Sequence, residues 1–248
     1  MDVIGVIPAR YGSTRLAAKA LADILGKPMI QHIYERAKQA SVLDDVIVAT
    51  DDERIAAAVT GFGGNVAMTS VQHSSGTERL TEVVFELDVK VVVNIQGDEP
   101  LIHPSMINDV AYALLENPKL VMSTLKHRIT SEEEYQNPNV VKVVTTKDGF
   151  ALYFSRSPLP HRLRAKDPSQ VPVFKHLGIY AYTKDFLLTF KGLKPSKLEE
   201  AESLEQLRAL EHGYPIKVIE TKHNTISVDT AEDLRRVIAS LRSSAEGL

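Results

Sequence analysis

The sequence has no cysteine among its 248 residues, which excludes disulfides, thiolate nucleophiles, and zinc or iron–sulfur sites with thiolate ligands. It also lacks a basic excess: the net charge is −3, so few cations are available to neutralise a nucleic-acid backbone. No apolar run is longer than a strand, and the N-terminus does not have the pattern of a secretion signal. We therefore expect a soluble cytoplasmic protein that neither inserts into a membrane nor binds nucleic acid.

Four common catalytic fingerprints are absent as well. The chain has no G-x-G-x-x-G after its first apolar run and no G-x-x-x-x-G-K-[ST], which argues against a dinucleotide dehydrogenase and a P-loop NTPase. G-x-S-x-G and H-E-x-x-H are also missing, which argues against a serine-hydrolase elbow and a zinc-protease helix.

The hydrophobic pattern that is present alternates between strands and helices. Buried strands are predicted at residues 3–7, 46–50 and 90–95, and a helix is predicted at 104–117. This alternation favours an α/β fold with a mostly parallel central sheet and helices on both faces. The middle third has more strand signals and predicts a smaller mixed β subdomain, with an irregular excursion at 158–172.

The stretch from Ile7 to Lys19 follows the first predicted strand and concentrates cations, hydroxyls and a glycine. A loop that leaves a strand is the usual place for a ligand in an open α/β sheet. Backbone N–H groups around Gly12 could cradle phosphate oxygens, which Arg10, Arg15 and Lys19 would neutralise. We interpret this stretch as an anion site, the alternative being a solvated loop.

Two acids stand after predicted strands, Asp98 in Gln96-Gly97-Asp98 and Asp229 before the last predicted helix. A carboxylate at the end of a central strand is costly unless it caps a helix or holds a cation. Asp229 taken alone would be a helix N-cap. Together with the cationic loop, the two acids suggest metal-assisted transfer of a nucleotidyl group, because Mg²⁺ binds a few carboxylates and takes phosphates or water as its other ligands.

Two further polar clusters have structural explanations when taken alone. Asp51-Asp52-Glu53 is explained by the start of a helix, and Ser75-Gly76-Thr77 by a loop with Thr77 as helix N-cap. His176 lies on one face of a predicted half-buried strand, where a lone histidine is more often structural than catalytic.

Eight short motifs, in order along residues 3–241, resemble the CMP-sugar-acid synthetases, and together they resemble the 3-deoxy-manno-octulosonate (Kdo) cytidylyltransferases in particular. Each motif alone is weak, but eight in register are specific. The motifs are Ile7 to Leu16 (IPARYGSTRL), Ala49 to Asp51 (ATD), Ser75 to Arg79 (SGTER), Gln96 to Pro100 (QGDEP), Ala151 to Arg156 (ALYFSR), His176 to Tyr180 (HLGIY), Leu204 to Arg208 (LEQLR) and Val228 to Thr230 (VDT).

This resemblance implies a Rossmann-like nucleotidyltransferase fold, a single domain over residues 1–248 with a dimerisation and sugar-binding elaboration at about 133–182. It also implies that CTP and Kdo give CMP-Kdo and pyrophosphate for lipopolysaccharide biosynthesis. Asp98 and Asp229 match the family's magnesium ligands and, with Lys19, its catalytic residues. The residues implied for the nucleotide are Ala9, Arg10, Arg15, Lys19, Ser75, Gly76, Glu78 and Arg79, and those implied for the sugar acid are Gln96, Arg156, His176, Tyr180, Glu205 and Gln206.

The implied reaction is an in-line attack of the anomeric hydroxyl of Kdo on the α-phosphate of CTP, with magnesium at Asp98 and Asp229 to lower the pKa of that hydroxyl. A second magnesium on the triphosphate, with Lys19 and Arg15, would neutralise the pyrophosphate. The resemblance also implies a homodimer formed through residues 133–172.

One segment departs from the family pattern, because Arg15-Leu16-Ala17-Ala18-Lys19-Ala20-Leu21 stands where the family has Arg-Leu-Pro-Gly-Lys-Pro-Leu. Losing two prolines and a glycine removes rigidity and the freedom of glycine to adopt a positive φ, so we expect an altered loop and altered triphosphate affinity. This altered loop leaves a non-catalytic homologue open as an alternative. Independently of the loop, a sialic acid or an 8-amino-Kdo analogue stays open as the substrate.

Overall fold

The computed structural model describes residues 1–12, 16, 18–73 and 75–246, and it divides the chain into two compact units. The first unit comprises residues 1–108 and 225–248, and the second comprises residues 109–224. The prediction of one domain with an elaboration at 133–182 stays a prediction, and the second unit contains that whole range.

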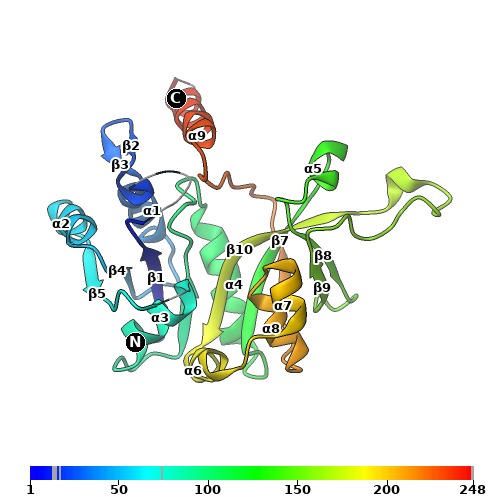
Figure 1. Ribbon diagram of the computed structural model, residues 1–248, viewed down its shortest axis with the longest axis horizontal. Helices are drawn as coiled ribbons and strands as arrows, with labels where there is room; N and C mark the ends of the chain where they lie inside the picture. Colours follow the sequence, from blue (N-terminus) through cyan, green and yellow to red (C-terminus); the bar gives the residue numbers. More distant parts are fainter. Residues whose placement is uncertain (13–15, 17, 74, 247–248) are drawn as a thin grey trace. The chain divides into compact units, whose positions relative to one another are not determined.

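The first unit is built on four parallel strands in the order β6-β1-β4-β5 (Figure 1). Strands β1 and β6 are buried along most of their length, which explains their continuous apolar sequence. The elements of this unit are β1 (Val3–Ala9), a 3₁₀ turn η1 (Lys19–Leu21), β2 (Asp23–Ile24), β3 (Lys27–Pro28), α1 (Met29–Ala37), β4 (Asp45–Thr50), α2 (Glu53–Gly61), β5 (Asn65–Met68), α3 (Gly76–Val84), β6 (Val91–Asn94), the first turns of α4 (Pro104–Glu116), and α9 (Ala231–Glu246).

The order of connections places a ligand site in this sheet. From β1 the chain moves outward through α1 to β4 and through α2 to β5, and then α3 returns it to β6 on the other side of β1. Because such crossovers are right-handed, the outward helices and α3 cover opposite faces. The direction of winding therefore reverses between β1 and β6, and in open α/β sheets ligands bind beside the carboxyl ends of the strands at such a point.

The second unit carries a mixed sheet in which β7 pairs in parallel with β11 and antiparallel with β10. The antiparallel strands β8 and β9 extend it from the other edge of β10. Its elements after α4 are β7 (Met122–Arg128), α5 (Glu132–Gln136), β8 (Lys142–Thr145), β9 (Ala151–Ser155), a 3₁₀ turn η2 (Pro168–Gln170), β10 (Phe174–Thr183), α6 (Lys184–Gly192), α7 (Lys197–Glu202), α8 (Gln206–Glu211) and β11 (Lys217–Glu220).

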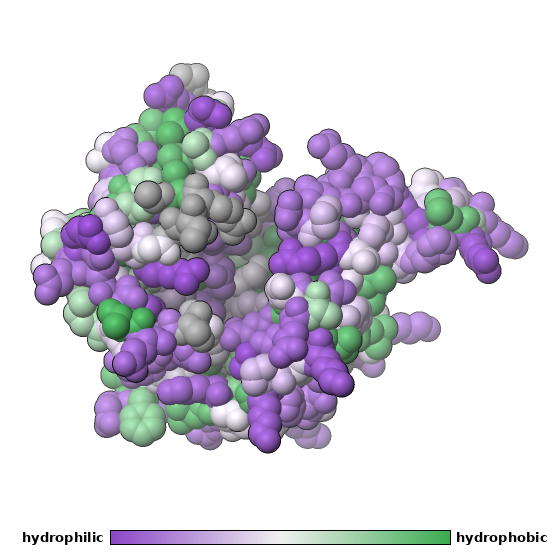
Figure 2. All heavy atoms as spheres, in the orientation of Figure 1, coloured by the Kyte–Doolittle hydropathy of each residue, from purple (hydrophilic) through white to green (hydrophobic). Residues whose placement is uncertain are grey.

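Residues 158–173 form the predicted excursion as an arm between β9 and β10, drawn in yellow-green at the right of Figure 1. Its visible surface is mostly hydrophilic in Figure 2, although Leu163 is 78% exposed. None of the helices that the structure describes is long and apolar enough to cross a membrane.

The predicted fold class, a mostly parallel α/β sheet with a smaller mixed region, is confirmed. Two local expectations are wrong. Ser75, not Thr77, is the N-cap of α3, because its hydroxyl accepts the Glu78 N–H at 3.3 Å. No strand precedes Asp229, since residues 222–229 have no regular structure.

Candidate active site

A cavity of about 340 Å³ opens at the carboxyl ends of β1 and β6, the point where the winding reverses. It lies entirely within the first unit. Most of the residues predicted for the nucleotide and both predicted metal ligands line it. The lining residues are Pro8, Ala9, Arg10, Lys19, Ala20, His73, Ser75, Gly76, Arg79, Gln96, Gly97, Asp98 and Asp229.

Gly97 lets the segment after β6 approach the end of β1. A Cβ atom at Gly97 would lie 2.5 Å from the carbonyl oxygen of Pro8, a distance that no side chain tolerates. A residue other than glycine would push apart the two strand ends that carry Arg10 and Asp98. The motif Gln96-Gly97-Asp98 thus has a packing reason for its glycine.

The carboxylates of Asp98 and Asp229 both contact the ammonium of Lys19. Lys19 Nζ lies 2.8 Å from Asp98 Oδ2 and 3.1 Å from Asp229 Oδ1. A backbone hydrogen bond from Val228 N–H to Asp98 C=O, at 2.8 Å, joins the two segments although 130 residues separate their sequences. The acids of Gln96-Gly97-Asp98 and Val228-Asp229-Thr230 therefore form one site.

The alternative explanation of Asp229 as a helix cap does not hold. The hydroxyl of Thr230 accepts the Asp233 N–H at 3.2 Å at the start of α9, and the Asp233 carboxylate accepts the Thr230 N–H at 3.0 Å. The Asp229 side chain accepts a hydrogen bond from Lys19 instead.

This arrangement fits a magnesium ion. The two carboxylate oxygens that converge on Lys19 Nζ lie 2.8 and 3.1 Å from it. A magnesium–oxygen bond is roughly 2.1 Å long, so both oxygens would have to move inward to bind one ion. In the described part of the chain no group of three or more His, Cys, Asp or Glu side chains gathers as a metal site. Two carboxylates suit magnesium, which completes its coordination with phosphates and water.

The backbone before Lys19 is strained. Ala18 has φ 53° and ψ 33°, the left-handed conformation, and its carbonyl accepts the Leu21 N–H at 2.8 Å. We expected alanine not to adopt the positive φ that is open to the family's glycine, and at Ala18 this expectation is wrong. A non-glycine residue pays about 1 kcal/mol for this conformation. Arg15 and Ala17 lie outside the described residues.

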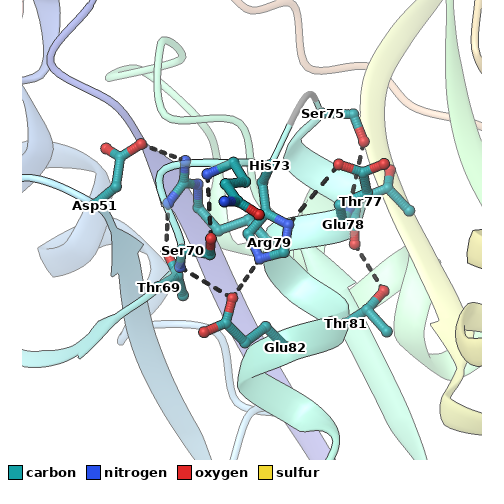
Figure 3. Close-up of polar contacts among 11 residues, drawn as sticks. Asp51, Thr69, Ser70, His73, Ser75, Thr77, Glu78, Arg79, Thr81 and Glu82 are labelled. Carbon is teal, nitrogen blue, oxygen red and sulfur yellow. Dashed lines mark hydrogen bonds and ion pairs between the residues drawn. The ribbon is translucent and has the colours of Figure 1, made fainter.

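Arg79 lines the cavity, and its guanidinium contacts neighbouring side chains rather than presenting a free charge (Figure 3). Only 4% of it is exposed, and its guanidinium donates to Asp51 Oδ2 at 2.7 Å and to the Thr69 hydroxyl. Asp51 follows β4 and Thr69 follows β5, so Arg79 ties α3 to both strand ends. The neighbouring acid Asp52 is the N-cap of α2, and its side chain accepts the Arg54 N–H at 2.9 Å.

His73 lines the cavity and was not predicted as a site residue. Its Nε2 contacts the Glu82 carboxylate, and its Nδ1 lies 3.8 Å from the carboxylate of Glu78, another residue predicted for the nucleotide (Figure 3). In the sequence, the one feature that could have indicated a place for His73 in the site is its position two residues before Ser75-Gly76.

The second unit holds a cluster around His176 and Tyr180, whose rings lie 5.4 Å apart. Burial lowers the pKa of His176 to about 3, so its ring is neutral. The Thr124 hydroxyl lies 2.7 Å from the carbonyl of Ile179 and 3.1 Å from that of Leu177, both of which can only accept, and 2.9 Å from His176 Nε2. His176 therefore donates from Nε2, which leaves Nδ1 as a hydrogen-bond acceptor.

Glu205 and Gln206 lie at the start of α8 in the same unit. The pKa of Tyr180 is raised by burial and by the negative charge of Glu205. Gln206 is only 4% exposed, and its Nε2 has no hydrogen-bond partner among the described residues. A buried amide that lacks a partner is a donor available to a ligand.

Arg156, by contrast, contacts backbone. Its guanidinium donates to the carbonyl oxygens of Glu202, Pro138 and Ser203 at 2.7, 3.2 and 3.4 Å. The remaining predicted sugar-acid residue, Gln96, lies in the cavity of the first unit. The structure thus places the predicted residues in two groups, one in each unit.

Comparison with known proteins identifies the family. The sequence profile described as Cytidylyltransferase matches residues 4–222. A relative named 3-deoxy-manno-octulosonate cytidylyltransferase from Syntrophotalea carbinolica is 54% identical over 98% of this chain and 99% of its own length. The chain belongs to the 3-deoxy-manno-octulosonate cytidylyltransferase family.

Another relative with the same name, from Geobacter sulfurreducens, is 52% identical over 98% of the chain and 100% of its own length. A solved CMP:2-keto-3-deoxy-manno-octonic acid synthetase complexed with CTP has a TM-score of 0.93 and 44% identity, covering 98% of this chain and 100% of its own. The predicted family is confirmed, while the roles of individual residues and the magnesium ion stay predictions.

Proposed function

We propose that this chain transfers the cytidylyl group of CTP to Kdo, giving CMP-Kdo and pyrophosphate for lipopolysaccharide biosynthesis. The observation that carries the proposal is the convergence of Lys19, Asp98 and Asp229 in a cavity at the winding reversal of the sheet. Such a site presents both a cation for phosphates and carboxylates for a metal. Full-length similarity to the named family supports the same activity.

In this reaction the triphosphate would lie along the cationic side of the cavity. Arg10 is exposed there and Lys19 is half-buried, so both can bind phosphate oxygens. Ser75 and Gly76 at the start of α3 would offer backbone N–H groups to the nucleotide. The anomeric oxygen of Kdo would form a bond to the α-phosphorus as the bond from that phosphorus to the bridging oxygen of pyrophosphate breaks.

Asp98 and Asp229 would hold a magnesium ion, which would lower the pKa of the attacking hydroxyl. The ammonium of Lys19 would then lose its contacts with the two carboxylates and bind a phosphate instead. The departure at Ala17 to Ala20 keeps this lysine, and the described backbone directs its ammonium into the cavity. This placement argues against a non-catalytic homologue.

For the sugar acid, we propose recognition by Gln96 and by the group His176, Tyr180, Glu205 and Gln206. The acceptor Nδ1 of His176 suits a sugar hydroxyl, and the donor Nε2 of Gln206 suits an acceptor on the ligand.

The deciding experiment measures pyrophosphate release from CTP and Mg²⁺ with Kdo, 8-amino-Kdo and N-acetylneuraminate in parallel. We expect release with Kdo and at most a trace with the other two. Release with another acid alone would replace the substrate, and no release with any of them would favour a non-catalytic homologue.

We also propose a homodimer in the cytoplasm, where CTP is made. A cavity of about 870 Å³ between α5 and the 158–173 arm, together with the exposed Leu163, offers a surface for a second copy. Sedimentation equilibrium of the purified protein tests this, and a monomer at micromolar concentration would contradict it.

A further inference from the structure

Glu82 on α3 fixes the orientation of His73 (Figure 3). Its Oε2 accepts the Ser70 N–H at 3.0 Å, and the same oxygen contacts Nε2 of His73. The Ser70 N–H, and after it the His73 ring, hold the pKa of Glu82 below its usual value. Glu82 is therefore a charged carboxylate, which can only accept hydrogen bonds. In its contact with His73, Nε2 must carry the proton and donate it.

The proton on Nε2 decides what the other ring nitrogen can do. In the neutral ring Nδ1 then has a lone pair and accepts hydrogen bonds. Nδ1 lies 3.8 Å from the carboxylate of Glu78, which is too far for a hydrogen bond. His73 lines the cavity at the ends of β1 and β6, and its side chain is 14% exposed. Nδ1 can therefore accept a hydrogen bond from a molecule bound in the cavity.

The surroundings of His73 suit an uncharged group better than a phosphate. The carboxylates of Glu78 and Glu82 both lie beside its ring (Figure 3). The guanidinium of Arg79 does not offset them, because it is paired with Asp51 at 2.7 Å. Two negative charges this close repel phosphate oxygens. A nucleotide in the cavity would therefore place its nucleoside, and not its phosphates, at His73.

We propose that His73 recognises the nucleoside by accepting a hydrogen bond at Nδ1, and that Glu82 is the positioning residue that orients it. The donor on the ligand is the cytosine amino group or a ribose hydroxyl, because a cytidine nucleotide carries no other hydrogen-bond donors on its nucleoside. The inference rests on the proposed function for the identity of the nucleotide and for the phosphates at Arg10 and Lys19. Neither His73 nor Glu82 is among the residues that the family resemblance implies for the nucleotide.

The first test measures the Kd of CTP in the presence of Mg²⁺ by isothermal titration calorimetry. His73→Leu removes the acceptor and keeps a side chain of similar size, so it should raise the Kd about tenfold. Glu82→Ala should raise the Kd about threefold to tenfold, because the ring loses its fixed orientation. The double variant should bind CTP no more weakly than His73→Leu, since Glu82 acts through His73.

A conservative variant and a control separate the orientation of His73 from a general loss of structure. Glu82→Gln keeps a carbonyl oxygen that can accept from both Ser70 and His73, so its Kd should stay within about twofold of the unmodified protein. The matched control is Glu35→Ala, which removes a carboxylate bonded to Lys27 at 2.9 Å in the same unit and should leave the Kd unchanged. KM for Kdo should change by less than about twofold in every variant.

Nucleotide analogues distinguish the two possible donors. UTP has an oxygen in place of the amino group of cytosine, and 2′,3′-dideoxy-CTP lacks both ribose hydroxyls. If His73 accepts from the amino group, His73→Leu should weaken the binding of CTP about tenfold and leave that of UTP unchanged. If His73 accepts from a ribose hydroxyl, His73→Leu should weaken CTP and UTP alike and leave the dideoxy analogue unchanged. Either pattern supports the inference.

A measurement on the ligand-free protein is independent of binding and activity. Long-range ¹H–¹⁵N NMR spectra at about pH 8.5 show which ring nitrogen of each histidine carries the proton. The signals of His73 are those that disappear in His73→Leu. We expect the Nε2–H tautomer in the unmodified protein and a mixture of both tautomers in Glu82→Ala. Adding CTP to the unmodified protein should then shift the Nδ1 resonance of His73 upfield, as an accepted hydrogen bond does.

The remaining outcomes overturn the inference or separate it from the proposed function. An unchanged Kd of CTP in His73→Leu, or an equal loss for CTP, UTP and the dideoxy analogue, would overturn recognition by His73. Additive losses in the double variant, or an Nδ1–H tautomer in the unmodified protein, would overturn the role of Glu82. If the unmodified protein binds CTP but releases no pyrophosphate with any sugar acid, the proposed function fails and the CTP affinities still decide the inference. If it does not bind CTP, both fail.

Discussion

The two groups of predicted site residues are built on different physical principles. In the first unit, Lys19, Asp98 and Asp229 neutralise one another while their side chains stay between 17% and 37% exposed. In the second unit, His176 is neutral because burial lowers its pKa, and the half-buried Tyr180 lies beside it. The first group can exchange one charged partner for another, whereas in the proposed function the second would recognise a ligand through the direction of hydrogen bonds.

Removing a carboxylate from the first group should have the largest effect. Asp98→Asn keeps the shape of the side chain but removes the charge that faces Lys19 and would bind the metal. We expect pyrophosphate release to fall on the order of 10³-fold while the far-UV circular dichroism spectrum is unchanged. Asp229→Asn should behave alike, since both acids serve one cation. A near-normal rate for Asp98→Asn at saturating Mg²⁺ would refute the assignment.

Changing the second group should alter stability as a function of pH. The pKa of His176 is lowered to about 3 in the folded state and is near 6.5 in the unfolded state. Below pH 6.5 the unfolded chain binds a proton that the folded chain refuses, so the free energy of unfolding falls as the pH falls. We expect His176 to contribute a loss of about 1–2 kcal/mol between pH 7 and pH 5.

The comparison that measures this loss is urea unfolding at pH 5, 6 and 7 for the unmodified protein and His176→Gln. The glutamine should remove this part of the pH dependence, whereas His161→Gln, at an exposed histidine of the arm, should not. Equal pH slopes in all three proteins would mean that His176 is protonated freely in the folded state.

Lys19 allows a direct test of charge exchange in the first group. Because its ammonium occupies the point between Asp98 and Asp229, it competes with a divalent ion there. Lys19→Met should therefore bind Mn²⁺ about tenfold more tightly in the absence of CTP, about 1.4 kcal/mol, measured by electron paramagnetic resonance of free Mn²⁺. The control is Lys27→Met, which breaks an exposed pair with Glu35 in the same unit and should leave Mn²⁺ binding unchanged.

The sequence was informative where site residues follow from strand order and less so where they follow from tertiary contacts. Asp98 could be predicted because it follows a strongly apolar strand, and it could be paired with Asp229 because both segments match one family. The pairing of Arg79 with Asp51 could not be predicted, since α3 and the end of β4 meet only in the folded sheet. The hydrogen bonds of Arg156 to backbone carbonyls could not be predicted either, because a motif records the residue and not the direction of its side chain.

The smallest effect should come from the strained backbone of the first group. Ala18 has φ 53°, which glycine adopts without a steric cost, although glycine also loses more entropy on folding. Ala18→Gly should therefore raise the free energy of unfolding by a few tenths to about 1 kcal/mol, measured by chemical denaturation. The matched control is Ala20→Gly in the buried 3₁₀ turn, where the same replacement should destabilise. If both variants destabilise equally, the left-handed conformation of Ala18 carries no strain, and the family's glycine is not needed to place Lys19.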